Sequence, residues 1–281
     1  LTIQYPASVT IDAWLDITQA TGNAILYRNG VVIASGSPIS LTEQLAAGLY
    51  NFTYYYPESE NYTEASITRQ LNITKGQTSL SLDASPSWTV DYNTTTTVSC
   101  SANGNQPLSL YRNGILVSNP DTAVLAAGTY SYVCNTTGNE NWTSASVSNT
   151  LVVNKAQTTL TLSASPNWTT EYGTQTTISC SANHNQGIIE LYRNGIVVAS
   201  GTGSVSETTT LAAGNYSYTC SINETANYSS ASISNTLNVN KATPPIHLAL
   251  NGNEADLTIQ YPASVTIDAW LDITQATGNA I

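Results

Sequence analysis

The fold is decided by the stretch Leu110-Tyr111-Arg112-Asn113-Gly114-Ile115-Leu116-Val117. It reads as two β-strands joined by Asn-Gly, the dipeptide that best accommodates the positive φ angles at both central positions of a type I′ hairpin turn. Leu26–Ile33 and Leu191–Val198 repeat the same pattern. The tyrosines of the three copies, Tyr27, Tyr111 and Tyr192, are 84 and 81 residues apart, so the spacing predicts one hairpin in each of three consecutive domains.

Two periods extend this pattern to the whole chain of 281 residues. Leu1–Ile25 is identical to Leu257–Ile281, and this period of 256 residues predicts tandem, near-identical units and a segment internal to a longer product. The Leu-Ala-Ala-Gly motif of Leu45–Gly48 returns at Leu125–Gly128 and Leu211–Gly214. We predict domain 1 at residues 1–76, domain 2 at 77–156, domain 3 at 157–241, and the start of a further copy of domain 1 at 242–281.

Short runs of β-type residues predict an all-β chain. Ser79–Leu82 and Thr159–Leu162 alternate polar and apolar side chains with a period of two, as half-buried strands do. Thr96–Cys100 and Thr176–Cys180 follow as second strands. Dense β-branched residues and frequent Gly, Pro and Asn argue against helices, and the spacing of the turns is that of β-sandwiches.

The cysteines occupy equivalent places in two of the domains. Cys100 and Cys134 lie in the second and sixth strand-like runs of domain 2, and Cys180 and Cys220 do so in domain 3. Tyr132 and Tyr218 precede the second Cys by two residues, where immunoglobulin domains place their corner tyrosine. On these residues the chain resembles the tandem immunoglobulin-like repeats of prokaryotic surface proteins, archaeal ones in particular, that form fibres or filaments.

The resemblance implies tandem immunoglobulin-like β-sandwich domains, with the B–F disulfides Cys100–Cys134 and Cys180–Cys220. Paired cysteines imply an oxidising compartment, and the resemblance implies an extracellular location at the cell surface. The chain departs from antibody domains because Trp88 and Trp168 precede the second strand, whereas no Trp lies in the third. Domain 1 has no Cys: alignment places Ala13 and Tyr54 at its two cysteine positions, a small and a large residue that together roughly preserve core volume.

Domain 1 also lacks the opening strand of the other two domains. The matching strand is Ile246–Leu250, ahead of the repeated Leu257, so we expect domain 1 to be complete only across a unit boundary. Covalent continuity in a head-to-tail array explains this, and so does strand donation between separate subunits. Continuity is favoured because Leu1–Ile25 and Leu257–Ile281 would compete for the same place in a domain completed by donation. The predicted partner in both cases is the chain itself.

Asn-X-Ser/Thr sequons predict covalent N-glycans. Three of them recur at one place, seven residues after Tyr54, Cys134 or Cys220, in the loop before the last strand of each domain. The alternative is that this Asn starts a turn and the aromatic residue after it packs beneath. Glycans would shield exposed strand edges. The sequons are at Asn51, Asn61, Asn72, Asn93, Asn135, Asn141, Asn167, Asn215, Asn223 and Asn227.

Composition and motifs exclude several functions. With 7 Lys and Arg and a net charge of −11, the chain lacks the clustered cations that nucleic acids require. It has no apolar run long enough to span a membrane. His184 and His247 lie in unrelated positions, where a satisfied surface histidine is the expectation. No nucleophile motif, phosphate loop or metal-ligand spacing is present, so we predict no enzyme activity, no catalytic or metal site and no cofactor.

Two minor alternatives remain. Asn251–Asp256 presents oxygen atoms at alternate positions, which suits calcium as well as a polar turn. Lys75, Lys155 and Lys241 recur at the domain boundaries, where they could form isopeptide cross-links or serve as solvated linker residues.

The sequence therefore predicts an extracellular structural protein, the repeat unit of a glycosylated cell-surface fibre or filament. The alternative is an adhesin that binds a glycan or protein through sandwich loops. Its motivation is the Tyr-rich stretch Tyr54-Tyr55-Tyr56, interpreted as an exposed loop, because tyrosine is favoured in such contacts.

Overall fold

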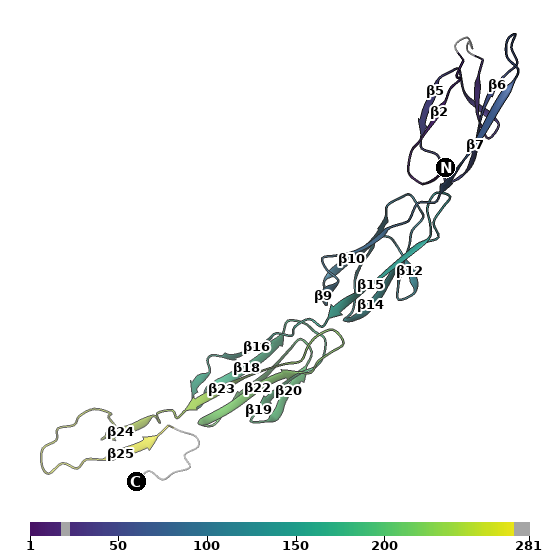
Figure 1. Cartoon of the computed structure of the whole chain (residues 1–281). Helices are drawn as coiled ribbons and strands as arrows, with labels where there is room; N and C mark the ends of the chain where they lie inside the picture. The colour runs from purple at the N-terminus through teal and green to yellow at the C-terminus, as the bar shows by residue number, and fades with distance from the viewer. Residues whose placement is uncertain (18–22, 273–281) are drawn as a thin grey trace. The chain divides into compact units, whose positions relative to one another are not determined.

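The computed structural model describes residues 1–17 and 23–272, and all regular secondary structure in these residues consists of β-strands (Figure 1). The chain divides into two compact units, Leu1–Lys155 and Ala156–Ile281. Domains 1 and 2 lie in the first unit; domain 3 and a further pair of strands lie in the second. The predicted all-β fold of tandem sandwiches is confirmed.

Domain 1 has a five-stranded sheet in the order β1-β7-β6-β3-β4 and a two-stranded sheet, β2-β5. Strand β1 runs parallel to β7, and the other pairs are antiparallel. The strands are β1 (Thr2–Gln4), β2 (Val9–Ala13), β3 (Ile25–Arg28), β4 (Val31–Ser35), β5 (Ile39–Glu43), β6 (Gly48–Tyr56) and β7 (Ala65–Thr74).

Domain 2 repeats this plan with one strand more in the small sheet. Its sheets are β13-β10-β8 and β12-β11-β14-β15-β9, with β9 parallel to β15. The strands are β8 (Leu80–Ser85), β9 (Thr89–Asp91), β10 (Thr95–Ala102), β11 (Ser109–Arg112), β12 (Ile115–Val117), β13 (Asp121–Val124), β14 (Gly128–Thr136) and β15 (Ala145–Asn154).

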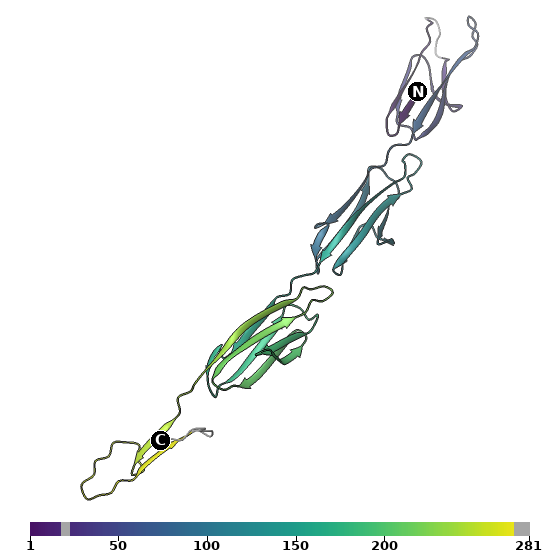
Figure 2. The same ribbon diagram turned by 60° about the horizontal axis from the view of Figure 1, so that its bottom comes forward.

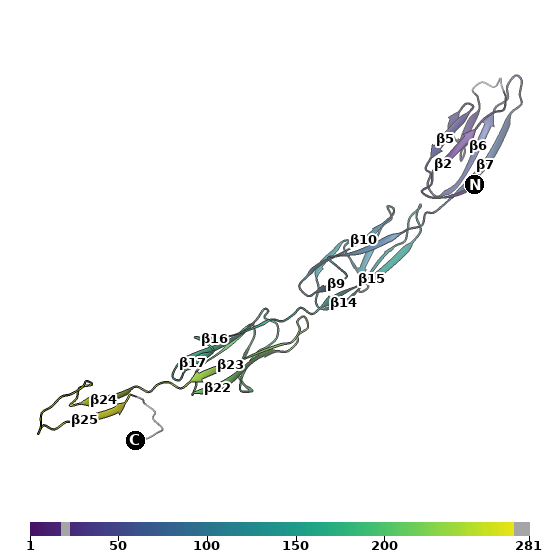
Figure 3. The same cartoon turned by 60° about the vertical axis from the view of Figure 1, so that its left-hand side comes forward.

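Domain 3 has the same two sheets, β16-β18-β21 and β17-β23-β22-β19-β20; Figure 3 labels β16, β17, β22 and β23. Its strands are β16 (Leu160–Ser165), β17 (Thr169–Glu171), β18 (Gln175–Ala182), β19 (Ile189–Arg193), β20 (Ile196–Gly201), β21 (Ser204–Thr210), β22 (Gly214–Ile222) and β23 (Ala231–Asn240). The antiparallel pair β24 (Ile246–Leu250) and β25 (Ile267–Leu271) follows, and its two strands lie side by side in Figure 2.

The three Asn-Gly hairpins have the backbone that the sequence predicts. The asparagines Asn29, Asn113 and Asn194 have φ angles of 49°, 50° and 51°. The glycines that follow them have φ angles of 81°, 79° and 82°. Positive φ at both central positions matches the twist of the flanking strands, so each hairpin ends the large sheet at β4, β12 or β20.

Each sandwich encloses its own core. In domain 2 the side chains of Val98, Leu110 and Leu151 surround the disulfide, and at most 1% of each is exposed. In domain 1 the buried residues form two clusters. One surrounds Leu26 on β3 and Tyr54 on β6, and the other surrounds Phe52 on β6 and Leu71 and Ile73 on β7. The expectation that Tyr54-Tyr55-Tyr56 is an exposed loop is wrong: these residues end strand β6, where side chains alternate between faces, so Tyr54 and Tyr56 are only 8% exposed.

Candidate functional site

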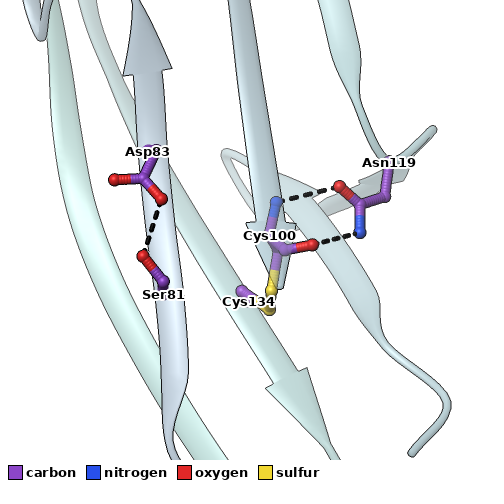
Figure 4. The surroundings of a disulfide bond; sticks show 5 residues. All are labelled: Ser81, Asp83, Cys100, Asn119 and Cys134. Carbon is purple, nitrogen blue, oxygen red and sulfur yellow. Dashed lines mark hydrogen bonds between the residues drawn. A yellow bond between two sulfur atoms is a disulfide. The ribbon is translucent and has the colours of Figure 1, made fainter. Parts of the chain in front are cut away.

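Disulfides join the two sheets of domains 2 and 3. Cys100 on β10 is bonded to Cys134 on β14, and Cys180 on β18 to Cys220 on β22. Figure 4 shows that the side chain of Asn119 extends the sheet beside the first bond. Its Oδ1 accepts a hydrogen bond from the Cys100 amide at 2.9 Å, and its Nδ2 donates to the Cys100 carbonyl at 2.8 Å. Strand β13 begins only at Asp121 and is too short to reach Cys100. The side-chain amide of Asn119 therefore bonds the backbone N–H and C=O of Cys100 in place of a longer strand.

The corner tyrosine lies two residues earlier than the sequence predicts. Tyr130 donates its hydroxyl hydrogen to the carbonyl of Ala126 at 2.9 Å, and Tyr50 and Tyr216 make the same bond four residues back in domains 1 and 3. Assigning Tyr132 and Tyr218 to this role is therefore wrong. Their rings are buried in the core, and their hydroxyl groups donate to the side-chain carboxylates of Asp121 and Glu207.

Tyr132 belongs to a buried polar cluster. Its hydroxyl donates to Asp121 Oδ2 at 2.7 Å, and Arg112 Nη1 lies 2.7 Å from the same oxygen. Burial and the hydrogen bond to Asp121 raise the pKa of Tyr132 to about 12, because both disfavour the phenolate. The Arg112 guanidinium keeps the carboxylate from being a lone buried charge.

Domains 1 and 3 contain versions of this cluster. In domain 3, Arg193 pairs with Glu207 at 2.6 Å, and Tyr218 donates to the second carboxylate oxygen at 2.7 Å. Burial and the bond to Glu207 raise the pKa of Tyr218 to about 12. In domain 1 the ion pair is Arg28–Glu43, and Phe52 occupies the place of the tyrosine. Each cluster joins the Arg of a hairpin to the opposite sheet.

The junction between domains 1 and 2 is built on Gly76. Its amide donates to the Asn141 carbonyl at 2.9 Å, and its carbonyl accepts from Thr143 at 3.0 Å. The Trp142 ring meets the edge of Tyr5 at 5.5 Å. A Cβ atom on Gly76 would lie 2.6 Å from the Tyr5 carbonyl oxygen and 2.9 Å from Trp142, so only glycine fits.

Polar bonds strengthen this junction. The amide of Ala47 donates to Asn141 Oδ1 at 2.8 Å, and Lys75 Nζ donates to the Asn139 carbonyl at 2.7 Å. Lys75 is thus hydrogen-bonded to the next domain. Side-chain and backbone hydrogen bonds thus join domain 1 and the linker to the loop of domain 2 that contains Asn139, Asn141 and Thr143.

Domain 3 fastens its own linker residue in the same way. Ala156 forms a parallel bridge with Tyr228, whose ring stacks on His184 at 3.7 Å. Nε2 of His184 lies 2.9 Å from Thr158 Oγ1, and its Nδ1 accepts from the Gln186 amide at 3.2 Å. His184 is thus a structural residue. In domain 2, Trp142 covers Gly104 at the corresponding place, and a Cβ there would lie 2.5 Å from the indole.

Most of the sequons present their asparagine to solvent. Asn51, Asn61, Asn72, Asn93, Asn167, Asn215 and Asn223 are exposed, whereas Asn135, Asn141 and Asn227 are half-buried. At two of the recurrent loop sequons, the side chain is engaged: Asn141 accepts from Ala47, and Asn227 Nδ2 lies 3.4 Å from Gln186 Oε1. The turn itself is held by Asn139 in domain 2 and Thr225 in domain 3, each two residues before the sequon Asn.

The two other candidate sites, His247 and the polar stretch Asn251–Asp256, have structural explanations. Nδ1 of His247 lies 3.0 Å from Glu254 Oε1, and its Nε2 lies 2.9 Å from Asp272 Oδ2. Asn251 has a φ angle of 51° and begins a turn with Gly252, which accounts for the polar stretch proposed for calcium. Across residues 1–17 and 23–272, no three His, Cys, Asp or Glu side chains group closely enough to hold a metal ion. Nor does the described part of the chain contain a helix able to cross a membrane.

Comparisons with known proteins bear on the fold alone. No protein-family model matches the chain, and no curated protein sequence matches it. The fibronectin(III)-like modules of Clostridium thermocellum CbhA are similar at 16% identity over 58% of this chain and 95% of theirs, with a TM-score of 0.26. Extracellular domains 3–5 of Drosophila OTK are similar at 12% identity over 86% of this chain and 94% of theirs, with a TM-score of 0.29. Amphioxus IgVJ-C2 is similar at 16% identity over 54% of this chain and 99% of its own, with a TM-score of 0.33.

Proposed function

We propose that the chain is the repeat unit of an extracellular, N-glycosylated structural fibre or filament at a cell surface, and that it has neither catalytic activity nor a cofactor. The observation that carries this proposal is the identity of Leu1–Ile25 and Leu257–Ile281, which sets a repeat of 256 residues. An array whose purpose is length tolerates homogenisation of its units, because every unit makes the same contacts with its neighbours.

The junctions support a structural role. Between domains 1 and 2 the linker is bonded at Lys75 and Gly76 and packed against Trp142, which restricts bending there. Domain 3 binds its own linker residue Ala156. Short, hydrogen-bonded linkers favour a stiff array, which suits a fibre.

Disulfides and sequons support the location. Both disulfides are buried between sheets, and such bonds form and persist in oxidising compartments. The exposed sequon asparagines are accessible to a glycosyltransferase, and glycans would keep a chain with only 9% charged residues in solution. An adhesin remains the alternative, but its motivation is lost because Tyr54 and Tyr56 are buried in domain 1.

Electron microscopy of the native cell-surface material tests the proposal. We expect filaments whose axial repeat corresponds to three domains, with extra density at the exposed sequons and glycopeptides at the same sites in mass spectrometry. The purified chain at increasing concentration provides a second measurement, since light scattering should show association. Compact, monodisperse particles in both experiments would overturn the fibre.

A further inference from the structure

A groove lies on the outer face of the large sheet of domain 2. It has a volume of about 670 Å³, and its walls come from β11, β14 and β15 and the segments next to them. The groove contains one aromatic ring, that of Tyr111, and several hydroxyl groups, among them those of Ser109 and Ser146. None of its lining residues is charged. This lining suits a neutral, hydroxyl-rich ligand, which is the chemistry of a saccharide.

The register of the strands places a sequon asparagine in the middle of the groove. Asn135 on β14 lies opposite Ser109 on one side and Ser146 on the other. Cys134, its neighbour along the strand, is fully buried, so the side chain of Asn135 is on the outer face. Tyr111 lies two residues along β11 from Ser109, on the same face, at a diagonal distance that an aromatic side chain can span.

Two polar groups in the groove have no protein partner. The side-chain amide of Asn135 and the hydroxyl group of Tyr111 make no hydrogen bond to any other residue within 1–17 and 23–272. Asn135 is half-buried, and so is Tyr111. A ligand in the groove would therefore meet the amide and the ring without displacing an existing hydrogen bond.

The equivalent face of domain 3 is arranged differently. There Ser221 occupies the place of Asn135, so this position is not a sequon. Tyr192, the counterpart of the groove tyrosine, donates its hydroxyl hydrogen to the Glu190 carboxylate. Domain 2 has Ser109 at the place of Glu190, and this smaller, uncharged residue leaves the tyrosine ring available.

The equivalent face of domain 1 is also without a sequon. Tyr55 occupies the place of Asn135 and donates its hydroxyl hydrogen to Glu64 at 3.0 Å. A carboxylate thus engages a tyrosine on this face in domains 1 and 3. Of the three domains, domain 2 alone combines a sequon asparagine with a tyrosine that no carboxylate engages.

A sugar ring attached to Asn135 would match this lining. Sugar rings carry C–H groups on their faces and hydroxyl groups around their rim. The C–H groups pack on the apolar body of an aromatic ring, as Tyr111 offers, and the hydroxyl groups exchange hydrogen bonds with serine hydroxyls. Because the asparagine itself lines the groove, the first sugar starts inside it.

We propose that the N-glycan of Asn135 folds back into this groove, with its first sugars stacked on Tyr111 and hydrogen-bonded to Ser109 and Ser146, and that it thereby stabilises domain 2. This proposal rests on the N-glycosylation proposed above. The transfer forms a bond from Asn135 Nδ2 to the anomeric carbon of the glycan, breaks the bond of that carbon to the phosphate of its activated donor, and releases an amide proton. It precedes folding, since the folded strand holds Asn135 between two neighbours.

A double-mutant cycle on the full chain, produced in cells that N-glycosylate it, tests the proposal. Unfolding of domain 2 is followed by hydrogen exchange over a guanidinium series. Tyr111→Ala should lower the midpoint at least twice as much in the glycosylated protein as in Asn135→Gln protein, which has no glycan in the groove. Tyr111→Phe keeps the ring and should leave the midpoint nearly unchanged in both backgrounds.

Removal of a glycan outside the groove provides the matched control. Thr95→Ala deletes the sequon of the exposed Asn93, and in this background the effect of Tyr111→Ala should equal that in the glycosylated protein. Nuclear Overhauser contacts between the Tyr111 ring protons and the first sugar are expected as well. Equal effects of Tyr111→Ala with and without the Asn135 glycan, together with the absence of these contacts, would refute the packing.

The occupancy of each sequon separates this proposal from the one on which it rests. Glycopeptides at other sequons but none at Asn135 would refute the groove glycan and leave the glycosylated fibre standing. No glycopeptide at any sequon would overturn the N-glycosylation itself. Glycans released from the native protein provide a last test: if they bind saturably at Tyr111 while Asn135 carries its own glycan, the groove takes a saccharide from elsewhere and the proposal is wrong.

Discussion

Replacing Cys100 and Cys134 with alanine removes the disulfide that joins the two sheets of domain 2. The bond closes a loop with a sequence separation of 34, and the loss of that constraint on the unfolded chain corresponds to about 4 kcal/mol. For a domain of this size the denaturant dependence is about 2 kcal/mol per molar guanidinium, so the unfolding midpoint of domain 2 should fall by about 2 M.

Hydrogen exchange read by mass spectrometry over a guanidinium series measures this for each domain separately. Domain 3, with Cys180–Cys220 intact, is the internal control and should keep its midpoint. A second variant, Cys100→Ala/Cys134→Tyr, copies the residues that domain 1 has at Ala13 and Tyr54 and should recover part of the loss by filling the space. A fall below about 1 kcal/mol in the alanine variant, or an equal fall in domain 3, would refute the reasoning.

Three further perturbations test the polar and packed sites. Tyr132→Phe should cost about 2 kcal/mol at neutral pH, because the hydroxyl bonds a carboxylate. The folded-state pKa is raised from 10 to about 12, so the wild-type stabilisation is complete below pH 10 and is lost as the pH rises towards 12; a stability titration of the variant should lack this loss. Gly104→Val should destabilise domain 2 by about 2 kcal/mol in thermal unfolding, because its Cβ would lie 2.5 Å from Trp142; no change would contradict the contact. Asn119→Ala leaves the Cys100 amide and carbonyl without their partners and should cost about 2 kcal/mol and speed amide exchange at Cys100; unchanged exchange would contradict it.

Local patterns made much of the fold predictable. The Asn-Gly turns have the positive φ angles that their residues favour, and period-two alternation identifies half-buried strands. The alignment that puts Ala13 and Tyr54 at the cysteine positions agrees with the pairing, since Leu26 lies opposite Tyr54 as Leu110 lies opposite Cys134. The alternation of side chains along β6 places Tyr54 on the buried face, and the interpretation of Tyr54-Tyr55-Tyr56 as a loop overlooked this alternation.

Other features depend on contacts that sequence spacing does not reveal. The carboxylate that meets the hairpin arginine is Glu43, Asp121 or Glu207, at separations of 15, 9 and 14 residues from its Arg. Because the connecting segments differ in length, no fixed motif marks the cluster. The corner hydrogen bond did have a signal, since the tyrosine always follows Leu-Ala-Ala-Gly at a fixed distance, but only the structure shows which carbonyl it reaches.

The uneven distribution of disulfides has a mechanical meaning. If a pulling force unfolds the sandwiches, a disulfide keeps the residues between its cysteines from extending. Domains 2 and 3 would withhold the segments between their bonded cysteines, whose sequence separations are 34 and 40. At roughly 3.5 Å per residue this is a length of roughly 120 Å and 140 Å. Domain 1 has no such restraint, so each repeat would contain one fully extensible element in series with two whose extension is limited.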